Sequence, residues 1–168
     1  MENVELNTQA RLSEHFNLGE LYKTSVNSLD GNIPGNEEIE NLKRLCPWLE
    51  ELRKRYNERY VSPPKLGGEK DTEEPVIITS GYRSPEVNRC VGGVHSSNHL
   101  TGCAVDIRCV GVEQAIRYAA ILLDTADDWK QDFDELLIER NRRGRYWVHF
   151  AVRPSSVGNR RKTLFIYQ

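Results

Sequence analysis

The chain has 168 residues, of which 38% are hydrophobic and 29% are charged. These values are ordinary for a folded globular protein and exclude a disordered, collagenous or membrane-embedded chain. A chain of this length removes roughly 70% of its extended surface from water on folding, so we expect residues 1–168 to form one domain without disulfide staples. Its 23 Lys and Arg against 25 Asp and Glu give a formal charge of −2. We therefore expect no nucleic-acid and no membrane partner. We also expect a monomer.

The cysteines and the N-terminal segment bear on the cellular compartment in which the protein folds. The four cysteines have no Cys-x-x-Cys spacing and are too sparse for a disulfide scaffold, so reduced thiols are expected. The first residues contain neither the basic nor the apolar region of a signal peptide, and no window approaches eighteen apolar residues. We expect a protein that is cytoplasmic until it is released by lysis or exported by another route.

The first half of the chain predicts helices and one loop. Residues 11–30 predict a short helical entry that ends in the turn signals around Asp30-Gly31. Residues 37–59 predict an amphipathic helix, within which Pro47 is expected to begin a second helical segment. Residues 61–75 are rich in Pro, Gly and charge, and they predict a mobile surface loop. The apolar spacing near 3.6 residues that predicts the helix is formed by Ile39, Leu42, Leu45, Leu49 and Leu52.

The middle of the chain alternates strands with short irregular segments. The β-branched run 76–80 predicts a buried strand, and 85–89 predicts a short helix with Ser84 as its N-cap. Residues 92–102 contain glycines and histidines and predict a loop. Residues 104–108 alternate between small or apolar and polar side chains, which is typical of a half-exposed strand.

The last third predicts one helix and three strands. A helix is expected over 112–123, strands over 133–140 and 145–152, and a final strand over 163–167. The tetrapeptide Asn141-Arg142-Arg143-Gly144 predicts a hairpin loop between the first two of these strands. Because strands and helices mix without strict βαβ alternation, we expect an α+β fold: a small, mostly antiparallel sheet with flanking helices.

Chemically active residues concentrate between Ser80 and Asp106, where polar side chains lie among several glycines. His99 and Asp106 are separated by six residues, and His149 lies in an apolar strand. Two imidazoles and one carboxylate suit a zinc ion that keeps an open position for water, whose pKa it lowers to about 7. Spacing alone leaves structural roles open, such as a core histidine for His149 and a capping carboxylate for Asp106. His95 competes as a ligand only if its glycine-rich segment is helical.

Several motifs occur in a fixed order, namely Ser80-Gly81-Tyr82-Arg83-Ser84, the run from Ser97 to Asp106, and Trp147-Val148-His149. Together they resemble the zinc D-Ala-D-Ala carboxypeptidase family, which also includes D-Ala-D-Ala dipeptidases and L-alanyl-D-glutamate endolysins. The resemblance covers most of the chain and is strongest to a small branch found in phages and Bacteroidetes-type genomes. It implies a fold like that of hedgehog proteins and D-Ala-D-Ala peptidases, a peptidoglycan stem peptide as substrate, and one zinc ion per chain. The implied zinc ligands are His99, Asp106 and His149.

The resemblance also implies roles for residues outside the ligand set. Arg83 corresponds to the family arginine that stabilises the oxyanion of the tetrahedral intermediate, a task suited to a rigid guanidinium group. Ser97 and Tyr82 correspond to positions near the substrate. From the residues alone, Ser97 is equally a loop hydroxyl and Tyr82 is equally a packing residue.

The general base is the point at which the family pattern changes. Relatives of the dipeptidase type carry a glutamate three residues before the last zinc histidine, where this chain has Tyr146. The small branch has a glutamate at the end of the preceding strand, which corresponds to Glu139, with Asp134 as the alternative. A four-residue hairpin loop would point Glu139 away from His149. A three- or five-residue loop, or a bulge, would place both side chains on one face of the sheet.

Taken together, the sequence predicts a zinc metallopeptidase that hydrolyses an amide bond in peptidoglycan stem peptides, of carboxypeptidase or endolysin type. The alternative is a noncatalytic, zinc-stabilised module that binds cell wall or belongs to a phage structure. The missing glutamate at position 146 favours the alternative, whereas Arg83 and the complete ligand set favour the enzyme.

Overall fold

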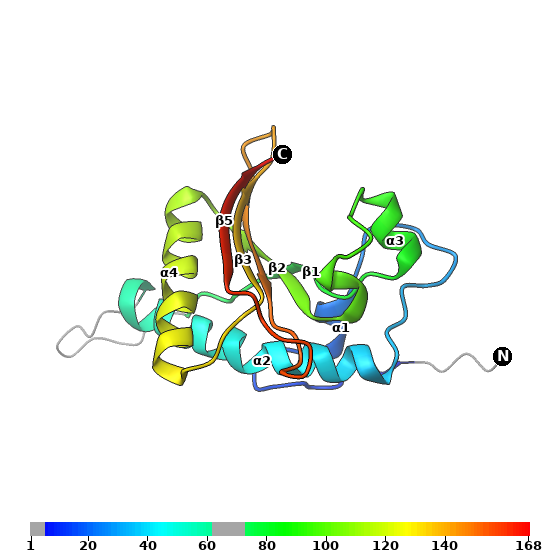
Figure 1. The fold of residues 1–168 in the computed structure, drawn as a ribbon, viewed down its shortest axis with the longest axis horizontal. Helices are drawn as coiled ribbons and strands as arrows, with labels where there is room; N and C mark the ends of the chain where they lie inside the picture. The colour runs from blue at the N-terminus through cyan, green and yellow to red at the C-terminus, as the bar shows by residue number, and fades with distance from the viewer. Residues whose placement is uncertain (1–5, 62–72) are drawn as a thin grey trace.

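A central sheet of five strands organises the fold (Figure 1). The structure is a computed structural model that describes residues 6–61 and 73–168, so residues 62–72 of the loop expected over 61–75 lie outside the described residues. The strands are β1 (Ile78–Ser80), β2 (Ala104–Cys109), β3 (Glu135–Arg140), β4 (Tyr146–Ala151) and β5 (Lys162–Tyr167). They lie in the order β1-β2-β4-β3-β5, and neighbours are antiparallel except β3 and β5, which are parallel. The predicted α+β domain with a small, mostly antiparallel sheet is confirmed.

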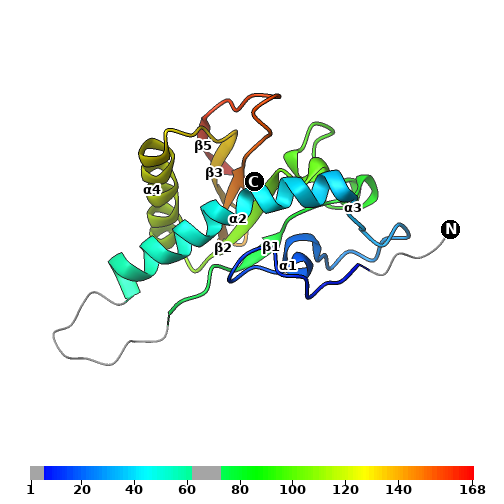
Figure 2. The same cartoon turned by 90° about the horizontal axis from the view of Figure 1, so that it is seen from below.

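Helices flank the sheet on both sides. They are α1 (Leu18–Tyr22), α2 (Asn36–Tyr56), α3 (Pro85–Cys90) and α4 (Val112–Trp129), with a π-helical turn η1 (Asn57–Val61) and a 3₁₀ turn η2 (Asn98–Thr101). In Figure 1, α4 lies along one face of the sheet, and α3 lies on the opposite side. Figure 2 shows the long α2 running from the α4 side to the α3 side. Within the described ranges, no helix has both the length and the apolar character that crossing a bilayer requires.

Side chains of the central strands alternate between two faces of the sheet. The core face is apolar and packs in one cluster with buried residues of α2 and α4; its members include Val105, Ile107, Leu136, Val148 and Phe150. The opposite face, which we call the site face, carries Asp106, Glu139 and His149. Burial of the apolar face therefore directs the polar residues of the same strands toward the side of the sheet where α3 and η2 lie (Figure 1).

The long helix α2 continues through Pro47, so the prediction of a second segment beginning there is wrong. A proline inside a helix removes one backbone hydrogen bond and crowds the preceding turn. Here the leucine stripe on both sides of Pro47 is completely buried and packs in the core cluster. Tertiary packing of that stripe outweighs the local cost, as is usual for amphipathic helices in proteins.

Other element boundaries differ by a few residues. Helix α4 extends past Leu123 because Thr125 and Ala126 continue its buried stripe. Strand β1 is shorter than the predicted strand over 76–80, and the predicted loop over 92–102 contains the 3₁₀ turn η2. Helix α3 begins as predicted, with the Ser84 hydroxyl accepting a hydrogen bond from a backbone N–H of its first turn.

The register of the hairpin between β3 and β4 decides which face Glu139 occupies. Arg140 pairs with Tyr146, so five residues connect the two strands. Leu137 is then directly opposite His149, and Glu139, two residues further along β3, shares the face of both. The structure thus has the five-residue loop, one of the alternatives that bring Glu139 to the site face.

A glycine bulge produces this register. Gly144 N donates to Asn141 O and Asn141 N donates to Arg145 O, while Gly144 has a left-handed backbone with φ of 77°. A type I turn followed by a left-handed glycine is a standard hairpin with one extra residue. That extra residue accounts for the difference between a four-residue loop and the observed connection.

Replacement of Gly144 by alanine should destabilise the protein by about 1 kcal/mol, because a left-handed backbone costs a residue with a Cβ about 1–2 kcal/mol. The added Cβ would meet only the end of the Arg140 side chain at 4.0 Å, so backbone strain is the main effect. We expect the melting temperature to fall by about 2–4 °C. The matched control Arg143→Ala, in the same exposed turn, should stay within about 0.5 kcal/mol of the parent. Equal melting temperatures for the two variants would contradict this account.

Candidate metal centre

Three secondary-structure elements bring His99, Asp106 and His149 together. His99 lies in η2, Asp106 in β2 and His149 in β4, where Asp106 and His149 are directly opposite each other in the antiparallel ladder. One donor atom from each residue lies within 4.8 Å of the other two, and all three residues are buried. Residues 43 positions apart in the chain thus become neighbours through strand pairing alone.

The ring of His99 is oriented by a backbone carbonyl. Its Nδ1 lies 2.7 Å from Gly81 O. Because a carbonyl oxygen can only accept, Nδ1 must carry the proton, and this leaves Nε2 with a free lone pair. Nε2 lies 3.3 Å from Asp106 Oδ1. The turn that carries His99 ends at Gly102, where a Cβ would lie 2.5 Å from Glu38 O of α2, so only glycine permits this close packing.

The ring of His149 lies between two carboxylates. Its Nδ1 is 3.0 Å from Asp106 Oδ1, and its Nε2 is 3.3 Å from Glu135 Oε2. Ionised carboxylates only accept hydrogen bonds, so without a metal both ring nitrogens carry protons. A metal ion bound at Nδ1 would replace one of these protons and leave the contact from Nε2 to Glu135 intact.

Two of the distances between these ligand atoms are close to those of a zinc site. Tetrahedral zinc with bonds of about 2.0–2.1 Å separates neighbouring ligand atoms by about 3.3–3.4 Å. Asp106 Oδ1 lies 3.3 Å from His99 Nε2 and 3.0 Å from His149 Nδ1, close to that separation. With His99 neutral, its lone pair faces a carboxylate oxygen, and a cation between the two would turn this repulsive contact into an attractive one. The residues His99, Asp106 and His149 therefore form a group that can hold a metal ion.

The protonation states of His99, Asp106 and His149 depend on one another. Burial lowers the pKa of His99, so this imidazole is neutral. Burial opposes protonation of His149 as well, but hydrogen bonds to Asp106 and Glu135 outweigh it and raise the pKa of His149 to about 9. Burial opposes ionisation of Asp106, yet the two neighbouring histidines lower its pKa below the ordinary range. The metal-free site at neutral pH therefore has one charged and one neutral imidazole around a carboxylate.

Arg83 reaches the centre through Asp106. One guanidinium nitrogen, Nη2, donates to Asp106 Oδ2 at 2.6 Å, and Nε donates to Ser80 Oγ at 2.8 Å. Asp106 is thus held through Oδ2, while Oδ1 faces the two histidines. The backbone N–H of Arg83 donates to His99 O at 3.0 Å, which ties the end of β1 to η2. Arg83 is therefore a partner of a candidate ligand, a contact that the sequence did not indicate.

Glu139 is a buried carboxylate on the site face, with 6% of its surface exposed. Burial raises its pKa above the ordinary value, and the negative charge of Asp106 adds to this effect. The side-chain amide of Gln168 donates to Glu139 Oε2. Glu139 therefore lies within the electrostatic field of the candidate ligands and holds a proton more readily than an exposed glutamate.

Asp134, the alternative base, is fully buried and completely engaged. Arg160 donates to both of its oxygens at 2.9 and 2.7 Å, and Asn98 donates to Oδ2 at 2.7 Å. Burial opposes ionisation, but these contacts and the charge of Arg153 lower the pKa of Asp134. A carboxylate held in this way stabilises the structure and is poorly suited to exchange protons with a substrate.

The two residues expected near the substrate have structural contacts. Ser97 Oγ accepts a hydrogen bond from His99 N at 3.3 Å and caps η2. Tyr82 is buried in the hydrophobic core cluster, and burial raises the pKa of its hydroxyl. Substrate binding by Ser97 and Tyr82 stays a prediction. The structure connects Ser97, but not Tyr82, directly to a candidate ligand.

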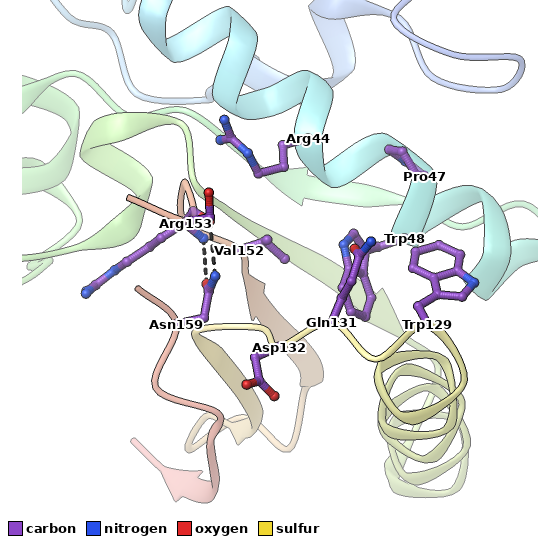
Figure 3. Close-up of a pocket in the computed structure, with 10 residues that line it drawn as sticks. Arg44, Pro47, Trp48, Trp129, Gln131, Asp132, Val152, Arg153 and Asn159 are labelled. Carbon is purple, nitrogen blue, oxygen red and sulfur yellow. Dashed lines mark hydrogen bonds between the residues drawn. The ribbon is translucent and has the colours of Figure 1, made fainter. Parts of the chain in front are cut away.

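A cavity of about 930 Å³ lies away from the three metal donors, between α2, the end of α4 and the segment after β4 (Figure 3). Trp48 and Trp129 line one side of it, and Arg44 and Asp132 also line it. Figure 3 shows two hydrogen bonds between Arg153 and Asn159: the backbone N–H of Arg153 donates to the Asn159 side chain, and the Asn159 side-chain amide donates to the backbone carbonyl of Arg153. The residues that line this cavity do not include His99, Asp106 or His149. The cavity is therefore not the candidate metal site.

Glu135 is the site residue that sequence reasoning missed. It lies four positions before Glu139 in the same strand, so strand periodicity alone places both on one face. That signal was present in the sequence, but it needed the register of β3 against β4 to become a contact with His149.

Zinc affinity should rise with pH by about tenfold per unit between pH 6.5 and 8.5. The His149 pKa of about 9 means that one proton must leave for each ion bound, whereas His99 is already neutral. Calorimetry in buffers of different ionisation enthalpy should report about one proton released per zinc ion at pH 7. Zinc affinity that does not vary over this pH range would refute the protonation state described for His149.

Comparison with protein families gives a match to part of the chain. Residues 68–143, just under half of the chain, match a family model described as Peptidase M15. The matched segment contains His99, Asp106 and Glu139, whereas His149 lies beyond it. A search of curated proteins finds no significant match. The family match supports the resemblance to zinc peptidases at the level of the family and does not distinguish its branches.

Proposed function

We propose that this protein is a zinc metallopeptidase that hydrolyses an amide bond in peptidoglycan stem peptides. The observation that carries the proposal is the convergence of His99, Asp106 and His149, with Glu139 on the same face of the sheet. The peptidase family match supports the reaction class. The stem-peptide substrate rests on the resemblance of the ordered motifs.

His99 Nε2, Asp106 Oδ1 and His149 Nδ1 would hold the zinc ion. When bound, zinc supplies Lewis acidity, which polarises a carbonyl oxygen and lowers the pKa of water. This chain would supply everything else that the reaction needs, namely a group that moves protons, donors to the developing negative charge, and exclusion of bulk water by the surrounding structure.

Glu139 is the proposed general base. Its carboxylate would take a proton from the attacking water and deliver it to the nitrogen of the leaving amine. A raised pKa suits both steps, because a base that is too weak accepts the proton poorly and an acid that is too weak does not return it. The hydrogen bond from Gln168 to Oε2 restricts the rotation of this side chain.

Arg83 is proposed to stabilise the oxyanion while it holds Asp106. A guanidinium group has five N–H donors, and the contacts to Ser80 and Asp106 use two of them. The remaining donors are available to an oxygen of the substrate. Ser97, next to the turn that carries His99, is proposed to contact the substrate as well.

The direct test is hydrolysis of purified peptidoglycan by zinc-loaded protein, followed by the release of amino groups. We expect removal of zinc with a chelator, or His149→Ala, to reduce release to background. Glu139→Gln should lower kcat by about 10²- to 10⁴-fold with zinc still bound, because it removes general-base catalysis. The matched control Glu113→Gln alters an exposed glutamate in the first turn of α4 and should keep full activity.

The products separate the possible activities. Free D-alanine released from soluble peptides that end in D-Ala-D-Ala would indicate a carboxypeptidase, and larger muropeptide fragments would indicate an endopeptidase. If zinc-loaded protein releases no product from any wall type or peptide, the noncatalytic wall-binding module becomes the better description. If Glu139→Gln retains full activity, the assignment of the base is wrong.

A further inference from the structure

Glu135, the first residue of β3, contacts the candidate metal centre from its outer side. Its Oε2 lies 3.3 Å from His149 Nε2, while the other ring nitrogen, Nδ1, faces Asp106 at 3.0 Å. The two nitrogens of an imidazole point in divergent directions, so Glu135 and Asp106 lie on opposite sides of the ring. Glu135 therefore contacts the ligand and not the position that the metal ion would occupy.

The Glu135 carboxylate is itself held in place from several sides. Asn98 Nδ2 donates to Oε2 at 3.0 Å, while Arg160 Nη2 and Lys162 Nζ lie 3.0 and 3.2 Å from Oε1. These partners come from η2, from the segment before β5 and from β5. A half-buried carboxylate with this many donors is ionised and fixed in position, which makes it a strong acceptor for an imidazole N–H.

The same carboxylate links the segments of both histidine ligands. Asn98, which donates to Glu135, directly precedes His99, and His149 contacts Glu135 from β4. A displacement of Glu135 would therefore be felt at two of the three candidate ligands. Glu135 lies where η2, β3 and β4 meet. A carboxylate at such a place can orient the metal ligands without binding the metal itself.

We propose that Glu135 is a positioning residue that fixes His149 with Nδ1 toward the metal ion and thereby sets the metal affinity of the site. The inference rests on the proposed zinc site and adds to it a residue that neither the motifs nor the family match assigns. A carboxylate that accepts the second N–H of a ligating histidine fixes the ring orientation and makes the ligand more basic. Loss of such a partner typically lowers metal affinity by roughly 10- to 100-fold.

The first experiment measures zinc affinity by competition with a chromophoric chelator. Glu135→Ala should weaken binding by about 10- to 100-fold. Glu135→Gln should stay within about threefold of the parent, because its amide oxygen still accepts the His149 N–H. The control Asp132→Ala removes an acidic side chain that pairs with Arg161 outside the site, and it should leave affinity unchanged.

A second readout separates positioning from a general contribution to stability. Side-chain ¹⁵N NMR of the zinc-loaded protein should show His149 bound through Nδ1 and protonated at Nε2, with an Nε2 proton that exchanges slowly. Glu135→Gln should retain this slowly exchanging proton, and Glu135→Ala should lose it. A residue that only stabilised the fold would lower the melting temperature without changing this signature.

Three results would decide against the inference. Zinc affinity in Glu135→Ala equal to that of the parent would overturn it, and so would NMR signals that identify Nε2 as the metal-bound nitrogen of His149. Failure of the parent protein to bind zinc at all would refute the proposed function and, with it, the role of Glu135. Zinc binding by the parent thus distinguishes the two failures: if the parent binds zinc, either of the first two results overturns only the role of Glu135.

Discussion

The antiparallel register between β2 and β4 is the constraint on which the whole site depends. Asp106 lies directly opposite His149 only in this register, and a slip by one residue would move one of them to the other face of the sheet. The register is enforced from the opposite side of the same strands, where Val105 and Phe150 are completely buried in the core cluster. Hydrophobic burial on one face of the sheet therefore fixes the positions of the candidate metal ligands on the other face.

Charge balance is the second constraint on the molecule. The sheet buries both Asp106 and Glu139, and the charge of Asp106 acts on Glu139. Burying a carboxylate without a partner costs free energy. Arg83 compensates Asp106 from one side, and in the metal-free protein the protonated His149 compensates from another. A divalent ion at the same donors would take over the compensating role of the proton. The arrangement thus explains why a group of buried charges can persist in a small domain, and why metal binding and protonation are linked.

The hairpin turn and contacts with distant segments together position the two glutamates of β3, Glu139 and Glu135. The left-handed Gly144 adds one residue to the hairpin, and this extra residue carries Glu139 to the face of His149. Glu135 reaches the same face from the other end of β3, where donors from η2 and from the chain around β5 hold it. One strand therefore supplies two carboxylates with different surroundings. Glu139 has a raised pKa, whereas the His149 hydrogen bond lowers the pKa of Glu135 to about 2.

The sequence by itself determined the fold class and most element positions, because apolar periodicity is a local property. The resemblance of its ordered motifs indicated His99, Asp106 and His149 as metal ligands, and the structure brings these three residues together. The sequence left the face of Glu139 open, since that depends on the loop geometry of one hairpin. It misjudged Pro47, because helix continuity there depends on packing against distant elements. Only the tertiary structure decided that Arg83 pairs with Asp106 and that Glu135 contacts His149. Such contacts join residues 14 to 23 positions apart, and local propensity contains no information about them.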